Sequence, residues 1–276
     1  MTRLVDGGPA LFAHRGFAGE NPENTVAAAE AAAGAGGADW IEIDVVPTGD
    51  GDPVVFHDAA LSGRGGPPGE PSDRGLTDAT GVVWETDTAT VTAAEVLGSG
   101  ETVPRLGEVL DTIPPEVGVN LELKNPGRRR SSLRPDETLA PDVLSDRKAV
   151  WRPFVERVLD VVGGRKNDLL ISSFHEAALA ATRERSEVAV APLFSESAAD
   201  ALTIAHRYDA AAVHPPLDAV RGTPFFDASR FGDADVVDAA HDAGRAVNTW
   251  TVETWFEAER LAAAGVDGVI ADYSTV

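Results

Sequence analysis

The sequence contains no cysteine, a single methionine and only three lysines among its 276 residues. The lack of cysteine excludes disulfides, thiolate nucleophiles and thiolate metal sites, so any bound metal must be held by oxygen or imidazole. Long apolar runs are also missing. None reaches the roughly 18 residues of a membrane-spanning helix, and the N-terminus has no apolar signal core. We therefore expect a cytoplasmic protein without stable membrane anchoring.

The charge of the chain is strongly one-sided. Forty-five acidic residues against 23 basic ones give a formal net charge of −22 and a sequence pI near 4.5. Such an excess argues against binding to nucleic acid or to anionic bilayers, so the expected partner is a small molecule. Arginine supplies 23 − 3 = 20 of the cations, and the acids are spread along the whole chain. This composition resembles that of proteins from a halophilic organism, and it predicts salt-dependent stability.

Short runs rich in Val, Ile, Leu and Ala alternate with longer Ala-rich segments. The pattern is typical of strands buried on both faces and joined by crossover helices. The expected strands are 10–14, 40–45, 53–57, 118–123, 168–174, 188–193, 210–214, 246–251 and 268–271. The expected helices are 25–35, 106–112, 152–162, 176–185, 198–208, 233–243 and 254–264.

The second and third strands are joined by a Gly- and Asp-rich turn that is too short for a parallel crossover. They should form a hairpin, and a turn centred on Asp50 and Gly51 would set Asp44 roughly opposite His57. Eight strands then remain for parallel pairing, the number that a closed barrel requires. We predict an α/β fold: a (β/α)8 TIM-like barrel with an extra antiparallel hairpin strand after strand 2. An open doubly wound sheet is the alternative.

The length fits one barrel domain covering residues 1–276. Two stretches interrupt the alternation, and we expect both to be loop insertions on the active face. Residues 60–75 are rich in Gly, Pro and Ser, and residues 125–150 include the run Arg128-Arg129-Arg130. That run could reach an anionic substrate, although the arginine-rich composition favours a solvated loop.

Two pairs of charged side chains are expected inside the barrel. Glu42 and Asp44 are two residues apart on a strand, so both point to the same face, and Glu122 and Lys124 repeat this arrangement on another strand. Buried carboxylates are costly unless they are paired or bind a metal. Three oxygen donors suit one divalent cation, Mg²⁺ or Ca²⁺. An ion-pair network around Lys124 is the alternative, and the neighbouring histidines favour the metal.

Those histidines are His14 and His57, each at the end of an apolar run where a strand can aim the imidazole at a substrate. With an unperturbed pKa of about 6.5, imidazole suits proton transfer at neutral pH. Arg15 follows His14 and could hold a phosphate or carboxylate through two parallel hydrogen bonds. His175 and His214 also end expected strands, so either could line the mouth of the barrel.

Eight motifs occur in a fixed order along the chain. They are His14-Arg15-Gly16, Glu23-Asn24-Thr25, Glu42-Ile43-Asp44-Val45, Pro53-Val54-Val55-Phe56-His57-Asp58, Val103-Pro104-Arg105-Leu106, Asn120-Leu121-Glu122-Leu123-Lys124, Trp250-Thr251-Val252 and Gly265-Val266-Asp267-Gly268. In this order they resemble the motifs of glycerophosphodiester phosphodiesterases, over nearly the whole chain. The resemblance implies a TIM-like barrel that hydrolyses glycerophosphodiesters to glycerol phosphate and an alcohol with a divalent cation.

The resemblance also implies roles for individual residues. The metal ligands that it implies are Glu42, Asp44 and Glu122. The implied acid/base pair is His14 and His57, without a choice of acid and base. The implied phosphate and glycerol contacts are Arg15, Lys124 and Trp250, where packing in the core is an equal alternative for the tryptophan. The nucleophile is either water or the neighbouring glycerol hydroxyl, through a cyclic phosphate.

Further positions concern the surroundings of the site. Glu23 and Asn24 are expected to support it or to cap a helix. Glu253 stands where the family often has asparagine, which bears on substrate shape.

Two rival functions stay open. A phospholipase-like phosphodiesterase acting on intact lipid should expose apolar residues at the barrel mouth, whereas the loops here are polar. A noncatalytic anion-binding barrel would need the acid cluster but neither His14 nor His57.

Overall fold

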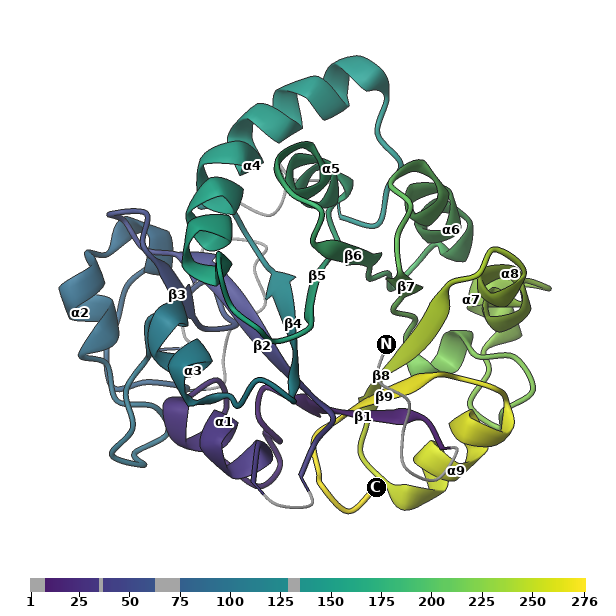
Figure 1. Cartoon of the computed structure of the whole chain (residues 1–276), viewed down its shortest axis with the longest axis horizontal. Coiled ribbons are helices and arrows are strands. Elements are labelled where there is room, and N and C mark those ends of the chain that lie inside the picture. The colour runs from purple at the N-terminus through teal and green to yellow at the C-terminus, as the bar shows by residue number, and fades with distance from the viewer. Residues whose placement is uncertain (1–7, 35–36, 63–74, 129–134) are drawn as a thin grey trace.

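The structure of the protein, a computed structural model, describes residues 8–34, 37–62, 75–128 and 135–276 (Figure 1). The strands are β1 (Ala10–His14), β2 (Trp40–Pro47), β3 (Pro53–Val55), β4 (Gly118–Leu123), β5 (Leu169–Ser173), β6 (Ala189–Pro192), β7 (Ala212–Val213), β8 (Ala246–Val252) and β9 (Gly268–Ala271). The α-helices are α1 (Val26–Ala32), α2 (Thr88–Thr92), α3 (Leu106–Thr112), α4 (Pro141–Val162), α5 (Glu176–Arg185), α6 (Ala198–Arg207), α7 (Ala228–Phe231), α8 (Val236–Asp242) and α9 (Trp255–Ala263). Short 3₁₀ turns are η1 (Val83–Glu85) and η3 (Leu217–Ala219).

Among the described residues the strands form one sheet in the order β6-β5-β4-β2-β1-β9-β8-β7. All neighbours in this order are parallel, and β3 pairs with β2 in the antiparallel sense outside it. The predicted barrel of eight parallel strands with an extra hairpin strand is confirmed. None of the described helices is both long enough and apolar enough to span a membrane.

The ring is nearly closed, and its last join lies between β6 and β7 (Figure 1). An isolated parallel bridge links Leu193 to His214, and the backbone N of Ala211 donates to the carbonyl of Val190 at 3.0 Å. The strand β7 has only two residues, so its joins to β6 and to β8 are both short.

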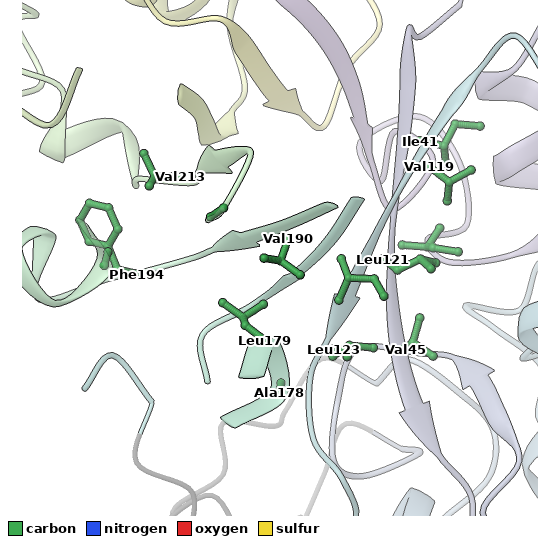
Figure 2. Close-up of a cluster of buried hydrophobic side chains, with 14 of the residues drawn as sticks. Ile41, Val45, Val119, Leu121, Leu123, Ala178, Leu179, Val190, Phe194 and Val213 are labelled. Carbon is green, nitrogen blue, oxygen red and sulfur yellow. The ribbon is translucent and has the colours of Figure 1, made fainter. Parts of the chain in front are cut away.

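The alternation of side chains along the strands explains why the core and the site lie on opposite sides of the sheet. Apart from Pro47 at the end of β2, the odd-numbered residues of β2 and β4 belong to the large hydrophobic cluster between strands and helices. They are Ile41, Ile43, Val45, Val119, Leu121 and Leu123. Figure 2 shows several of them in one cluster with Leu179 of α5. The even-numbered residues of the same strands therefore point into the barrel, as the sequence predicted for the carboxylates.

The predicted register of the hairpin is wrong by one residue. The backbone N of Phe56 donates to the carbonyl of Asp44 at 3.0 Å, so Phe56 rather than His57 lies opposite Asp44. The reason is the turn, which is closed by a hydrogen bond of 3.0 Å from the backbone N of Thr48 to the carbonyl of Asp52. His57 consequently follows the end of β3 instead of belonging to it.

The helix α4 begins at Pro141 instead of at residue 152, so the second half of the expected insertion 125–150 is largely helical. Proline is favoured at the first helical position, where the backbone N–H has no partner. Charged residues in the first turns of α4 obscure its helical pattern in the sequence. Further along the helix, the side chains of Trp151 and Phe154 are buried and anchor it. Most of the expected insertion at 60–75, and Arg129 and Arg130, lie outside the described residues. The single domain 1–276 stays a prediction.

The segment after β3 builds a second hydrophobic cluster beside the barrel. Its buried members are Val46, Val54, Phe56, Leu61, Leu76, Val83, Val91, Ala94, Val96 and Val103. Phe56 anchors the chain in this cluster immediately before His57. The second histidine is thus held by an extension of the barrel rather than by its eight-strand ring.

Candidate active site

A cavity of about 340 Å³ lies at the carboxyl ends of the parallel strands, the end at which α/β barrels carry their active sites. Nearly all of the predicted site residues line it. They are His14, Arg15, Glu42, His57, Glu122, Lys124 and Trp250. The remaining one, Asp44, is fully buried directly beneath, with a carboxylate oxygen 3.1 Å from Nε of Arg15.

Glu42, Asp44 and Glu122 form one buried acid cluster. One carboxylate oxygen from each residue lies within 4.8 Å of those of the other two. Nζ of Lys124 lies 2.6 Å from Oε1 of Glu122 and 3.5 Å from Oδ1 of Asp44. None of Oε1 of Glu42, Oδ1 of Asp44 and Oε1 of Glu122 has a hydrogen-bond partner among the described residues, but the latter two face Nζ of Lys124. Lys124 therefore pairs with two of the acids and leaves the third with an unsatisfied oxygen.

The electrostatics of the cluster are uneven. Burial, followed by the charges of Asp44 and Glu122, raises the pKa of Glu42 well above its ordinary value. Burial also raises the pKa of Glu122, against the opposing charge of Lys124. Burial acts in the same direction on Asp44, but Lys124 and Arg15 together hold its pKa below the ordinary value. Carboxylates that resist ionisation in each other's presence are stabilised by a cation, and hard oxygen donors fit a divalent one.

Neighbouring side chains hold the acid cluster in place. Nδ2 of Asn24 donates to Oδ2 of Asp44 at 2.8 Å, and Oδ1 of Asn24 accepts the backbone N–H of Asp44 at 3.1 Å. The backbone N of Arg15 donates to Oε2 of Glu42 at 3.0 Å, and its Nη1 donates to Oε1 of Glu23 at 3.0 Å. Glu23 and Asn24 thus contact predicted site residues, whereas the cap of α1 is Thr25.

His14 and His57 each have Nδ1 against a carboxylate. The distance is 2.6 Å from His14 to Oδ1 of Asp272 and 2.5 Å from His57 to Oδ1 of Asp58. When Nδ1 donates its proton to such a partner, Nε2 keeps a lone pair that can accept a proton. Burial and the charge of Lys124 lower the pKa of His57 to about 4.

Neither carboxylate partner, Asp58 or Asp272, is among the site residues predicted from the sequence. Asp58 directly follows His57 in the chain, so its position next to the histidine could have indicated the pair. Asp272 follows β9, which pairs with β1 in parallel register and thereby brings it to His14. The pair of Asp272 and His14 forms only when the barrel closes, so no local sequence pattern predicts it.

The remaining predicted residues divide into pocket and core. His175 and Trp250 line the pocket. The ring of Phe174 packs edge-on against Trp250, with centroids 5.5 Å apart, so this tryptophan forms part of the pocket wall. His214 does not line the pocket. It is buried with Nε2 3.1 Å from Nδ2 of Asn248, and burial lowers its pKa to about 3.

Exposed aromatic side chains follow the carboxyl end of β8, although they are not among the residues that line the cavity. Trp255 and Phe256, 65% and 43% exposed, begin α9 just after β8, the strand that carries Trp250 into the pocket. Phe225, in the segment after β7, packs edge-on against Phe256 with centroids 6.0 Å apart. We call these three residues, Phe225, Trp255 and Phe256, the aromatic rim.

The barrel, with a cavity that brings two imidazoles to a buried acid cluster, has the architecture of an α/β-barrel enzyme. Residues 14–276 match the model of the glycerophosphoryl diester phosphodiesterase family, and the chain belongs to this family. The predicted enzyme class, a glycerophosphodiester phosphodiesterase and hence a phosphoric diester hydrolase, is confirmed.

Individual relatives agree with this assignment. A glycerophosphodiester phosphodiesterase of Bacillus altitudinis is 28% identical over 275 residues, covering 95% of this chain and 94% of the relative. A phosphodiesterase of Oleispira antarctica, solved in complex with its product sn-glycerol-3-phosphate, superposes with a TM-score of 0.72 at 27% identity, covering 97% of this chain and 94% of the other. A lysophospholipase D of Rattus norvegicus is 35% identical over 113 residues, covering 41% of this chain and 35% of the relative.

Proposed function

We propose that the protein hydrolyses small glycerophosphodiesters to glycerol phosphate and an alcohol, using His14 and His57 for proton transfer. The observation that carries the proposal is that both histidines line the cavity formed around the acid cluster, each with Nδ1 against a carboxylate. One imidazole accepts the proton of the attacking hydroxyl as the new P–O bond forms. The other donates a proton to the alkoxide released when the old P–O bond breaks. The attacking hydroxyl is that of water, which gives glycerol phosphate directly, or that of the substrate glycerol, which gives a cyclic phosphate that water opens to glycerol phosphate in a second step.

Glu42, Asp44 and Glu122 would hold one divalent cation, Mg²⁺ or Ca²⁺, and the unpartnered buried oxygen of Glu42 supports this fit. Bound there, the cation would withdraw negative charge from the phosphoryl oxygens. Arg15 and Lys124 line the same cavity and are placed to neutralise the phosphate directly. The wall formed by Trp250 would orient the glycerol moiety.

The decisive experiment measures the release of glycerol phosphate from glycerophosphocholine and glycerophosphoethanolamine. It is run with and without Mg²⁺, Ca²⁺ or Mn²⁺, at high salt. We expect activity that EDTA abolishes and that His14→Ala and His57→Ala each reduce by at least about 100-fold. His241→Asn is the matched control, because His241 is 41% exposed on the surface and also lies beside a carboxylate, 2.8 Å from Asp267. Full activity of His14→Ala, or in EDTA, contradicts the mechanism.

A second candidate substrate, a glycerophosphodiester that carries an acyl chain, is favoured by the aromatic rim. Exposed aromatic side chains beside a pocket provide contact area for a hydrocarbon chain or a lipid–water interface. The net charge of −22 disfavours anionic lipids, so the substrate of this kind would be zwitterionic. Comparing lysophosphatidylcholine with glycerophosphocholine as substrates separates the two candidates.

We also propose that the protein works in a salt-rich cytoplasm. The support is compositional: an acid excess spread along the chain and arginine in place of most lysines.

A further inference from the structure

Asn120 is a polar side chain of the pocket that has no role in the proposed mechanism. The parallel register of β1, β2 and β4 places His14 opposite Glu42 and Glu42 opposite Asn120, so these three side chains form one row across the barrel. Asn120 is 1% exposed and lines the cavity. Neither its Nδ2 nor its Oδ1 has a hydrogen-bond partner among the described residues.

A buried amide with both polar atoms unpaired is destabilising, and buried polar groups are paired in nearly all native structures. An apolar residue at this position would pack in the barrel without that cost. Because Asn120 borders the cavity, its partner is best supplied by a molecule that enters the cavity. The unpaired amide therefore marks a contact point for the substrate.

The chemistry of the amide selects the kind of group that it meets. Phosphoryl oxygens only accept hydrogen bonds, and Arg15 and Lys124 already line the cavity as cationic partners for them. A hydroxyl both donates and accepts, so it complements the carbonyl oxygen and the NH₂ group of one amide. We propose that Asn120 is a substrate-binding residue that recognises a hydroxyl of the glycerol moiety. The inference rests on the proposed function and assigns to it a residue for substrate specificity.

The chain offers a matched control one strand away. Ser172 lies opposite Glu122 in the register of β4 and β5 and is completely buried. Its Oγ also has no hydrogen-bond partner among the described residues, but Ser172 does not line the cavity. Ser172→Ala thus removes a comparable polar group without altering the pocket surface.

The test removes the Asn120 amide and a hydroxyl of the ligand, separately and together, and compares the affinities. Calorimetry with Mg²⁺ present measures the affinity of sn-glycerol 3-phosphate, 3-hydroxypropyl phosphate and 2-hydroxypropyl phosphate, the last two each lacking one hydroxyl. For the wild type we expect at least one analogue to bind about 10-fold more weakly than glycerol phosphate, because it leaves the amide unpaired. In Asn120→Leu, glycerol phosphate should lose about the same factor, and that analogue should show no further loss. Ser172→Ala should keep the wild-type pattern.

The inference is overturned if Asn120→Leu weakens all three ligands equally or none, or if the wild type binds all three alike or binds none. Asn120→Ser, which keeps a smaller hydrogen-bonding group, replaces the leucine variant if the latter fails to fold. Because binding requires no turnover, this result is separate from the test of hydrolysis. A wild type that discriminates the hydroxyl but cleaves no diester would refute the proposed function while retaining this role for Asn120.

Discussion

Oδ1 of Asp272 lies 2.6 Å from Nδ1 of His14, although 258 positions separate the two residues in the chain. The pair forms where the last strand of the barrel meets the first, since β9 and β1 are parallel neighbours. The carboxylate fixes the orientation of the ring and favours the tautomer with a free Nε2. If His14 transfers a proton as proposed, Asp272 acts on the reaction through it, as a positioning residue.

Replacing Asp272 by asparagine should lower kcat by about 10- to 100-fold with little change in KM, because the imidazole loses its orientation and its charge partner. The pH profile of kcat should shift as well, which a purely structural role of Asp272 would not produce. Steady-state kinetics across pH on glycerophosphocholine provide the measurement, with His241→Asn as the control. An unaltered profile would show that His14 needs no such partner.

Replacing Glu42 by glutamine should uncouple thermal stability from divalent cations. Without metal, the variant should melt at the same temperature as the wild type or higher, since burial and two neighbouring acids disfavour the charge of Glu42. With millimolar Mg²⁺ or Ca²⁺, the wild type should gain several degrees and the variant little or nothing. Differential scanning fluorimetry measures both. A metal-dependent gain of equal size in the two proteins would exclude Glu42 as a ligand.

Replacing His214 by glutamine should reduce the loss in the free energy of unfolding as the pH falls below about 6.5. The pKa of His214 is about 3 in the folded state and about 6.5 in the unfolded chain, so between these values only the unfolded chain binds the proton. The stability contributed by the neutral ring is present above about pH 6.5 and is lost as the pH falls. At the limiting slope, this loss is about 2 kcal/mol between pH 6.5 and pH 5. Urea unfolding of both proteins at the two pH values measures it, and equal losses would contradict the prediction.

The melting temperature should rise with salt. At low ionic strength the net charge of −22 favours expansion of the fold, whereas molar KCl screens repulsion to within a few ångströms. We expect an increase of about 5 °C or more between 0.05 and 2 M KCl, measured by circular dichroism. A melting temperature that does not respond to salt would remove the support for a halophilic origin.

The double variant Trp255→Ala, Phe256→Ala tests the aromatic rim. If the rim contacts an acyl chain, the ratio of kcat/KM for lysophosphatidylcholine to that for glycerophosphocholine should fall by about 10-fold or more, because a large apolar contact area is lost. Assays below the critical micelle concentration of the lipid separate chain binding from adsorption to micelles. An unchanged ratio would leave the small diester as the only supported substrate.

Local patterns predicted much of this protein from its sequence. The strands Ala10–His14, Gly118–Leu123 and Gly268–Ala271 have the predicted bounds, because short apolar runs between polar turns fix buried strands. The two-residue spacing of Glu42 and Asp44 was enough to place both on the inner face. These features depend only on residues close together in the chain.

What sequence patterns failed to predict depends on distant parts of the chain or on small offsets. The pairing of Asp272 with His14 requires the closed barrel, and the register at Phe56 depends on one hydrogen bond in a turn. The aromatic rim combines Phe225 and Phe256 from segments after two different strands. No local periodicity carries such information, whereas the order of strands in the sheet does.

The barrel is closed between β6 and β7 by a short backbone pairing. Regions with few backbone pairings open locally at a low cost in free energy, so we expect the barrel to open near the bridge between Leu193 and His214. The cavity is lined by Leu193 on one side of that link and by Trp250, two strands on, at the other. A ligand that contacts both residues would bind the closed barrel better than the opened one. Its binding would therefore also stabilise the closed barrel.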